Sequence, residues 1–202
     1  MRVAVLSSGG KDSVTAAWWA ICRGWDVVAF VTVRIVGDDS WMFQMPATEQ
    51  VGNHARRLGI PWEVVESHGN AEEEVQDLES HLGAMLAEAP FDGIVSGALR
   101  SEYQRTRLDR MAHRLNIRSF APLWHHDPKQ HMLDLATLGF DVRVASTSSD
   151  GLDDSWVGIR LDEVALDRLL DASVAYRFNL DGEGGEYETT VVDGPLFPAP
   201  QG

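Results

Sequence analysis

The sequence predicts an α/β protein with a doubly wound, mostly parallel, Rossmann-like sheet followed by a small C-terminal α+β subdomain. Short apolar runs alternate along the chain with segments whose apolar residues follow helical spacing. This alternation is typical of parallel strands joined by right-handed crossovers. The runs are rich in β-branched residues, as strands buried on both faces are. Hydrophobic residues make up 44% of the 202 positions, which is enough for one core with both faces of a sheet covered.

The expected elements follow from periodicity. Residues 3–6 form a strand that ends in a glycine-rich turn, and Val14, Ala17 and Ile21 then mark the apolar side of a helix. The elements expected next are strand 26–33, helix 48–58, strand 62–65, helix 71–88, strand 92–96, a helix capped by Ser101, helix 129–138 and strand 140–145. We therefore expect a nucleotide-binding domain over residues 1–147.

The remaining residues, 148–202, are expected to form a smaller substrate-binding subdomain. A polar loop comes first, then a short helix over 162–170. A segment of glycines and acidic residues over 181–186 leads into a strand at 189–192.

The net charge limits the choice of partners. Acidic residues outnumber basic ones by 31 to 17, giving a formal charge of -14. This charge repels a nucleic-acid backbone, so no nucleic acid is expected as a partner. Two explanations of the acidity stay open, namely a cationic partner or adaptation to a high-salt cytoplasm. No apolar run approaches the roughly 18 residues of a membrane helix, and no signal-peptide pattern follows Met1. We expect a cytoplasmic protein with no membrane contact.

The glycine-rich turn predicts a phosphate site. Backbone N–H groups and the helix dipole converge where a strand leads into a helix N-terminus. The turn supplies hydroxyls, glycines and a cation from Ser7, Ser8, Gly9, Gly10, Lys11 and Ser13. Asp12 would repel a polyphosphate unless it holds Mg²⁺ or caps the helix. The spacing differs from the G-x-x-x-x-G-K-[ST] loop, which disfavours a kinase.

Two further segments predict ligand contacts. In the first, Gly97 follows a strand end and Gln104 lies four residues before Leu108, so Gln104 is expected on the packed side of its helix. For Arg100 and Arg105, ligand contact and surface ion pairing are equally expected. The second segment, 182–189, alternates glycines with acidic residues beside a tyrosine, and its carboxylates suit a cation, an amine or Mg²⁺.

The pattern S-x-G-G-x-D-S after an N-terminal strand resembles the PP-loop of the ATP pyrophosphatase superfamily. With S-G-A-L-R-S-E-Y-Q-R-T-R, Leu123-Trp124 and G-E-G-G-E-Y-E-T, nearly the whole chain resembles the diphthine–ammonia ligase family. The resemblance implies that the loop holds the β and γ phosphates of ATP as leaving pyrophosphate. It implies elongation factor two as protein partner, its diphthine being amidated to diphthamide with release of AMP.

On this hypothesis Lys11, Asp12 and Ser13 carry the catalysis, with Asp12 holding Mg²⁺ and with Gln104 or Arg105 orienting the α-phosphate. Diphthine carries a trimethylammonium group, which aromatic faces and carboxylates bind well. The residues expected to bind the substrate are Glu183, Gly184, Gly185, Glu186 and Tyr187.

The nitrogen donor is inferred from cysteine usage. Cys22 is the only cysteine and falls on the apolar side of the first expected helix. A glutaminase needs a reactive cysteine, so free ammonium is the expected donor.

Several alternatives stay open. The chain could be a superfamily member that acts on a free metabolite or a modified base, or a non-catalytic ATP-binding regulator. A zinc site at His125, His126 and His131 is disfavoured by their spacing. A homodimer is left open, and so is a lid formed by residues 42–48.

Overall fold

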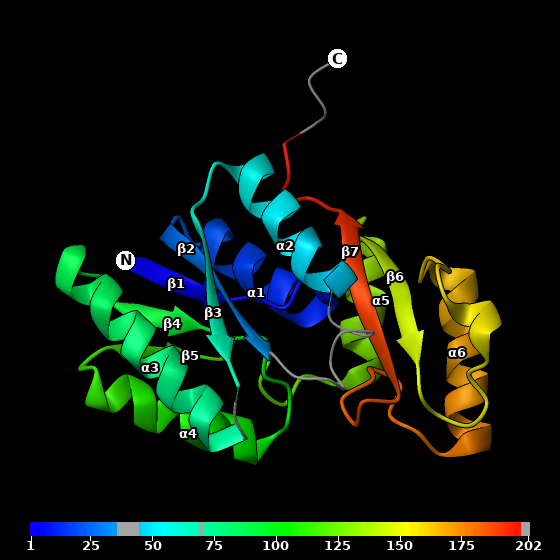
Figure 1. Ribbon diagram of the computed structural model, residues 1–202. Helices are drawn as coiled ribbons and strands as arrows, with labels where there is room; N and C mark the ends of the chain where they lie inside the picture. The colour runs from blue at the N-terminus through cyan, green and yellow to red at the C-terminus, as the bar shows by residue number, and fades with distance from the viewer. Residues whose placement is uncertain (36–44, 69–70, 199–202) are drawn as a thin grey trace.

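A computed structural model describes residues 1–35, 45–68 and 71–198. Five parallel strands form the main sheet in the order β3-β2-β1-β4-β5 (Figure 1). Their bounds are β1 Arg2–Leu6, β2 Asp26–Ile35, β3 Trp62–Ser67, β4 Gly93–Val95 and β5 Arg118–Phe120. The helices between them are α1 Lys11–Cys22, α2 Met45–Leu58, α3 Ala71–Glu88 and α4 Glu102–Arg114. The predicted doubly wound parallel sheet is confirmed.

The main sheet buries both of its faces. Alternate residues of β1 point to opposite sides, so Val3 and Val5 pack in one buried cluster and Ala4 in another. Helices α1 and α2 cover the first face, and α3 and α4 cover the second, as Figure 1 shows. The strands are buried on both faces and the helices on one face. These two patterns of apolar residues allowed the elements to be predicted from the sequence.

A second, antiparallel sheet pairs β6 (Asp141–Thr147) with β7 (Tyr187–Asp193). It packs with α5 (Pro128–Thr137), the short 3-10 helix η1 (Asp154–Trp156) and α6 (Glu163–Tyr176). We expected the strand near residues 140–145 to belong to the first domain, but its pairing with β7 places it in this second sheet. The division at residue 147 stays a prediction.

Other differences from the sequence reading are local. Helix α6 runs to Tyr176 rather than ending near residue 170, and β5 was not predicted because its three residues include an arginine and a serine. Ser101 caps α4 as expected, since its side chain accepts a hydrogen bond from the Gln104 N–H. Of the segment 42–48, residues 42–44 lie outside the described residues, and α2 begins at Met45.

The strand order places a switch point beside β1. Strand β1 pairs with β2 on one side and with β4 on the other, so the chain leaves β1 and β4 in opposite directions around the sheet. Ligands of open α/β sheets bind outside the carboxyl ends of strands at such a point. A ligand site is therefore expected at the loops that follow β1 and β4.

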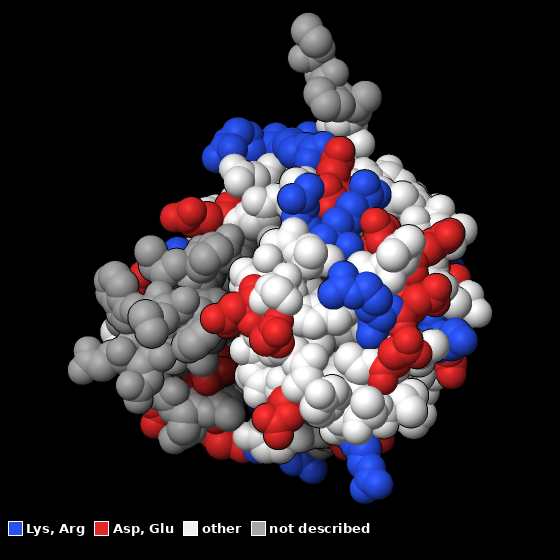
Figure 2. Space-filling view, turned by 90° about the vertical axis from the view of Figure 1, so that its right-hand side faces the viewer, with Lys and Arg blue, Asp and Glu red and all other residues white. Residues whose placement is uncertain are grey.

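Charged side chains are interspersed on the face turned to the viewer in Figure 2, with arginines beside acidic residues. Among the ion pairs of the described residues, Arg57 pairs with Asp193 at 2.7 Å and Arg143 with Asp141 at 3.0 Å. Exposed pairs of this kind contribute little to stability. Within the described parts of the chain, no helix has the length and apolar character needed to cross a membrane.

Candidate active site

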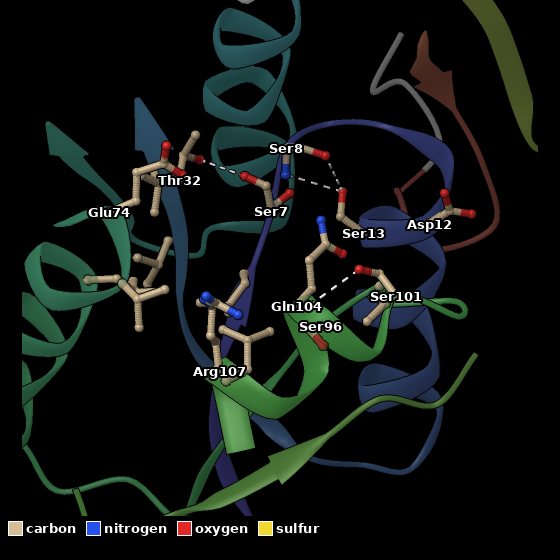
Figure 3. A pocket seen from close by; sticks show the side chains of 18 of the residues that line it. Ser7, Ser8, Asp12, Ser13, Thr32, Glu74, Ser96, Ser101, Gln104 and Arg107 are labelled. Atoms are coloured by element: carbon tan, nitrogen blue, oxygen red, sulfur yellow. Dashed lines mark hydrogen bonds between the residues drawn. The ribbon is translucent and has the colours of Figure 1, made fainter. Parts of the chain in front are cut away.

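A pocket of about 730 Å³ lies at the switch point (Figure 3). Its wall is formed by the loop after β1, the carboxyl ends of β2 and β4, helices α3 and α4, and residues just before and within β7. The polar lining residues are Ser7, Ser8, Asp12, Ser13, Thr32, Glu74, Ser96, Ser101, Gln104, Arg107, Glu183 and Glu188. The side formed by β2 and α3 is apolar, with Val31, Val33, Val75 and Leu78.

The loop between β1 and α1 is braced by its own serines. Gly9 adopts a φ of 81°, which glycine reaches without strain. The Ser13 hydroxyl donates to the Gly10 carbonyl at 3.0 Å and accepts from the Ser8 N–H at 3.3 Å. Ser7, Ser8 and Ser13 all line the pocket. The predicted loop therefore presents its hydroxyls to a cavity at a helix N-terminus, where anions bind.

Two glycines of the site are needed for contacts within the protein. A Cβ on Gly10 would lie 3.2 Å from the backbone oxygen of Thr189 in β7. A Cβ on Gly97 would lie 2.5 Å from the backbone of Asp12, so only glycine lets the loop after β4 approach the start of α1. For Gly10, the close approach in the structure is that of β7.

Lys11 and Asp12 form one hydrogen-bonded group with a histidine that the sequence reading missed. The Lys11 side chain is buried and its Nζ donates to Asp12 Oδ2 at 2.9 Å. His131 of α5, which is 3% exposed, contacts the other Asp12 oxygen through Nε2 at 2.8 Å. Burial raises the pKa of Asp12, but the charge of Lys11 and the hydrogen bond from His131 outweigh it and lower the pKa below its ordinary value. Asp12 is thus an anion.

His131 could not be found from sequence because 119 residues separate it from Asp12. We had considered it only with His125 and His126 as a zinc site. In the structure His131 turns to Asp12, and no cluster of three or more histidine, cysteine or acidic side chains suited to a metal ion occurs among the described residues.

Of the predicted segment that contains Gly97 and Gln104, some residues line the pocket and others contact only the protein. Gly97 and Gln104 line the pocket, and the Gln104 side chain points toward the loop in Figure 3. We had expected Gln104 on the packed side of its helix. In the structure Gln104 is instead exposed and faces this cavity. Arg105 is not part of the pocket wall. It pairs with Asp109 at 3.4 Å and lies over the ring of Trp124.

Arg100 and Arg107 occupy different environments: of the two alternatives left open for Arg100, the structure shows ion pairing. Arg100 makes a bidentate pair with the buried Asp181, at 2.7 and 2.8 Å. Arg107 lines the pocket. Its guanidinium lies over the ring of Tyr103 and pairs with Glu72, while its buried Nε has no hydrogen-bond partner among the residues that the structure describes. A buried unpaired donor in a pocket wall is suited to a ligand.

The predicted segment 182–189 presents only some of its acidic residues to the pocket. Glu183 lines the pocket and accepts from the Arg100 N–H at 3.2 Å. Glu186 accepts hydrogen bonds from Asn179 N–H, Asn179 Nδ2 and Gly184 N–H, between 2.7 and 2.8 Å. It therefore closes the loop upon itself. Gly184 and Gly185 are exposed and do not belong to the pocket wall.

Tyr187 lies beneath the site. Its ring is 3% exposed, and its hydroxyl donates to the Leu180 carbonyl at 2.6 Å. Burial, followed by the charges of Asp12 and Asp181, raises the pKa of Tyr187 well above its ordinary value. The next residue, Glu188, lines the pocket; it belongs to the predicted segment 182–189 but was not among the residues expected to bind the substrate. Burial and the charge of Asp12 raise the Glu188 pKa against the opposing effect of Lys11.

Cys22 differs from the expectation. It is exposed and occupies the last position of α1, whereas the pocket adjoins the first turn of that helix. A rise of 1.5 Å per residue separates the two ends by roughly 16 Å. Cys22 cannot act as a nucleophile in this pocket.

The main-sheet architecture also occurs in a solved structure. The crystal structure of a predicted subunit of tRNA methyltransferase from Methanocaldococcus jannaschii matches with a TM-score of 0.50 and 16% sequence identity. The match covers 96% of this chain and all of the other chain. At this identity the likeness concerns the fold alone.

Sequence comparisons identify the family. The model of the diphthamide synthase N-terminal domain matches residues 1–119, and that of the C-terminal domain matches residues 127–199. Diphthine–ammonia ligases of Rattus norvegicus and Homo sapiens are each 31% identical over 98% of this chain and 80% of their own. The ligase of Danio rerio is 32% identical over 98% of this chain and 84% of its own. Residues of both matched regions line the pocket, and this chain belongs to the diphthamide synthase family.

Proposed function

We propose that the chain is an ATP-dependent diphthine–ammonia ligase, which converts the diphthine of elongation factor two to diphthamide in the cytoplasm. The observation that supports this most is the lining of one pocket by the serine hydroxyls of the 7–13 loop and by carboxylates from the C-terminal region. The first group suits the phosphates of ATP, and the second suits a cationic substrate. Elongation factor two is the proposed protein partner, and a homodimer stays a prediction.

The pocket fits ATP in size and in the distribution of polar groups. Its volume of about 730 Å³ lies within the range of small-molecule sites. The apolar side formed by β2 and α3 suits a nucleoside, and the Nε–H of Arg107, which has no partner in the described part of the chain, could serve an acceptor on it. Gln104 points between this side and the loop, where the α-phosphate would lie.

The charges of the pocket indicate a need for a divalent cation. Asp12, Glu183 and Glu188 line the same cavity as the serine loop, and Asp12 is an anion. These carboxylates would repel a triphosphate unless a cation lay between them. Asp12, with oxygens already held by Lys11 and His131, is the residue proposed to hold Mg²⁺. When bound, Mg²⁺ neutralises charge on the phosphates.

In the proposed reaction, an oxygen of the diphthine carboxylate attacks the α-phosphorus of ATP. The bond to the β-phosphate breaks, and pyrophosphate leaves with the electron pair while the loop stabilises its charge. Ammonia then attacks the acyl carbon of the acyl-adenylate, a proton is lost from nitrogen, and AMP leaves. Ser7, Ser8 and Ser13 hold phosphate oxygens, and Lys11 supplies the cation next to Asp12. Glu183 and Glu188 face the trimethylammonium group.

The test uses the purified chain with diphthine-bearing elongation factor two, ATP, Mg²⁺ and ammonium. We expect AMP and pyrophosphate in equal amounts, and mass spectrometry of the factor should show a hydroxyl replaced by an amino group. In cells, deletion of the gene should leave diphthine on the factor. Normal diphthamide in the deletion strain would show that the substrate is another molecule. ATP binding without any AMP release would instead indicate a regulator.

A further inference from the structure

Helix α1 begins without a capping side chain of its own. Its N-cap residue is Gly10, which has no side chain to accept a hydrogen bond from the first turn. The free N–H groups of a first turn need partners, and serine, threonine, aspartate or asparagine at the N-cap ordinarily supplies one. Here the Lys11 N–H donates to the hydroxyl of Thr189, at 3.1 Å. The cap thus comes from strand β7, 178 residues away in sequence.

A second contact ties the same strand to the other side of the loop. The Val191 N–H donates to the Gly9 carbonyl at 3.1 Å. Together with the Thr189 hydroxyl, this bond holds the two peptide groups that flank Gly10. A Cβ at Gly10 would lie 3.2 Å from the Thr189 backbone oxygen, so a side chain there would push β7 and the loop slightly apart. Strand β7 therefore lies along the loop and determines its path from Gly9 to Lys11.

Strand β7 is itself held in place. The Val191 carbonyl contacts the buried His54 through Nε2 at 2.7 Å and accepts from Gln50 Nε2 at 3.0 Å. Its other edge pairs with β6. Thr189 is 6% exposed, so its hydroxyl is shielded from water that could replace the bond to Lys11. The hydroxyl is thus a rigidly placed acceptor, as positioning of a site requires.

We propose that Thr189 is a positioning residue for ATP: its hydroxyl keeps the phosphate-binding loop in the conformation in which Ser7, Ser8 and Ser13 face the pocket. This inference rests on the proposed function in that ATP is taken as the ligand. The loop lies in the region matched by the N-terminal family model, whereas Thr189 lies in the region matched by the C-terminal one. Phosphate binding therefore depends on both regions, and the C-terminal region does more than bind the second substrate.

The experiment compares Thr189→Val, which removes the acceptor at nearly constant volume, with Thr189→Ser, which keeps it. Thr190→Val is the matched control, since Thr190 is the next residue of β7 and lies on its other face. The dissociation constant for ATP with Mg²⁺ is measured by calorimetry in the absence of elongation factor, at a temperature where all variants are folded. We expect Thr189→Val to raise it about tenfold, as loss of a buried hydrogen bond does. Thr189→Ser and Thr190→Val should stay within about twofold of the wild type.

Equal ATP affinity in wild type and Thr189→Val would overturn the proposal, as would equal losses in Thr189→Val and Thr189→Ser. If the valine variant does not fold, Thr189→Ala against Thr189→Ser answers the same question, because only serine restores the hydroxyl. Wild-type protein that binds ATP but does not amidate diphthine would overturn the proposed function alone. Wild-type protein that binds no ATP would overturn both.

Discussion

The loop over residues 7–13 and the loop over residues 181–188 both adjoin the pocket, but they use their side chains differently. In the first loop, Ser7, Ser8 and Ser13 all face the pocket. In the second, Glu183 and Glu188 face it, while Glu186 closes the loop and Tyr187 is buried beneath it. The comparison shows that neighbouring residues of similar chemistry act together only where the backbone turns them to the same side.

The physical cause lies in the local backbone. A strand-to-helix turn converges on one point, so most polar groups in it share a target. An extended strand sends alternate residues to opposite faces, and β7 therefore turns Tyr187 and Thr189 inward and Glu188 toward the pocket. The sequence therefore identifies the pocket-lining residues of a strand-to-helix turn more completely than those of an extended strand.

The largest expected effect tests the first loop. Lys11→Ala should lower the rate of AMP formation by about 10²-fold or more, because the cation beside the departing pyrophosphate is lost. The control is Lys129→Ala, since Lys129 is the chain's other lysine and is exposed on α5. An unchanged rate of AMP release in Lys11→Ala would remove Lys11 from the mechanism.

The next effect separates the two glutamates of the second loop. Glu188→Gln should lower kcat/KM for the diphthine-bearing factor about tenfold, because a charged contact in the pocket is lost. Glu186→Gln should instead lower the thermal midpoint, since its new amide would face the N–H donors of Asn179 or Gly184. Both quantities are measured for both variants. The reverse pattern, with catalysis lost only in Glu186→Gln, would show that the loop rearranges when substrate binds.

A smaller effect is expected at Tyr187, which we first assigned to substrate binding and now propose as a support for the loop. Tyr187→Phe removes the hydroxyl that donates to the Leu180 carbonyl, which should reduce the free energy of unfolding by about 1 kcal/mol. Denaturant titration measures this change, and the KM for the factor should not change. A raised KM with unaltered stability would return Tyr187 to the substrate site.

The smallest effect concerns pH and the strand that both loops adjoin. Burial lowers the pKa of His54, which holds the Val191 carbonyl of β7. The unfolded chain then binds a proton more readily than the folded one, so stability is complete above about pH 6.5 and is lost as the pH falls toward the folded pKa. Thermal midpoints measured across this range should fall more steeply for the wild type than for His54→Gln. Parallel curves would exclude His54 as the source of the pH dependence.

Much of the fold could be predicted because its signals are local. The strand before the 7–13 loop, the helices that follow and the Ser101 cap all depend on periodicity and on residues within four positions of one another. Strand β5 gave no such signal, since it is three residues long and owes its place to pairing with β4. The same limit applied to strand 141–147, whose existence was predicted but whose partner was not.

By itself, the sequence determined the parallel α/β sheet, the position of the 7–13 loop between strand and helix, and the family resemblance, because each depends on residues that are neighbours in the chain. Only the tertiary structure decided which side chains complete the site. It brought His131 to Asp12, Thr189 to the Lys11 N–H and Arg107 to the pocket wall, and it took Arg105 and Tyr187 away. The contacts of His131 and Thr189 join segments far apart in sequence, and the packing of the second sheet and its helices against α1 and α2 sets them.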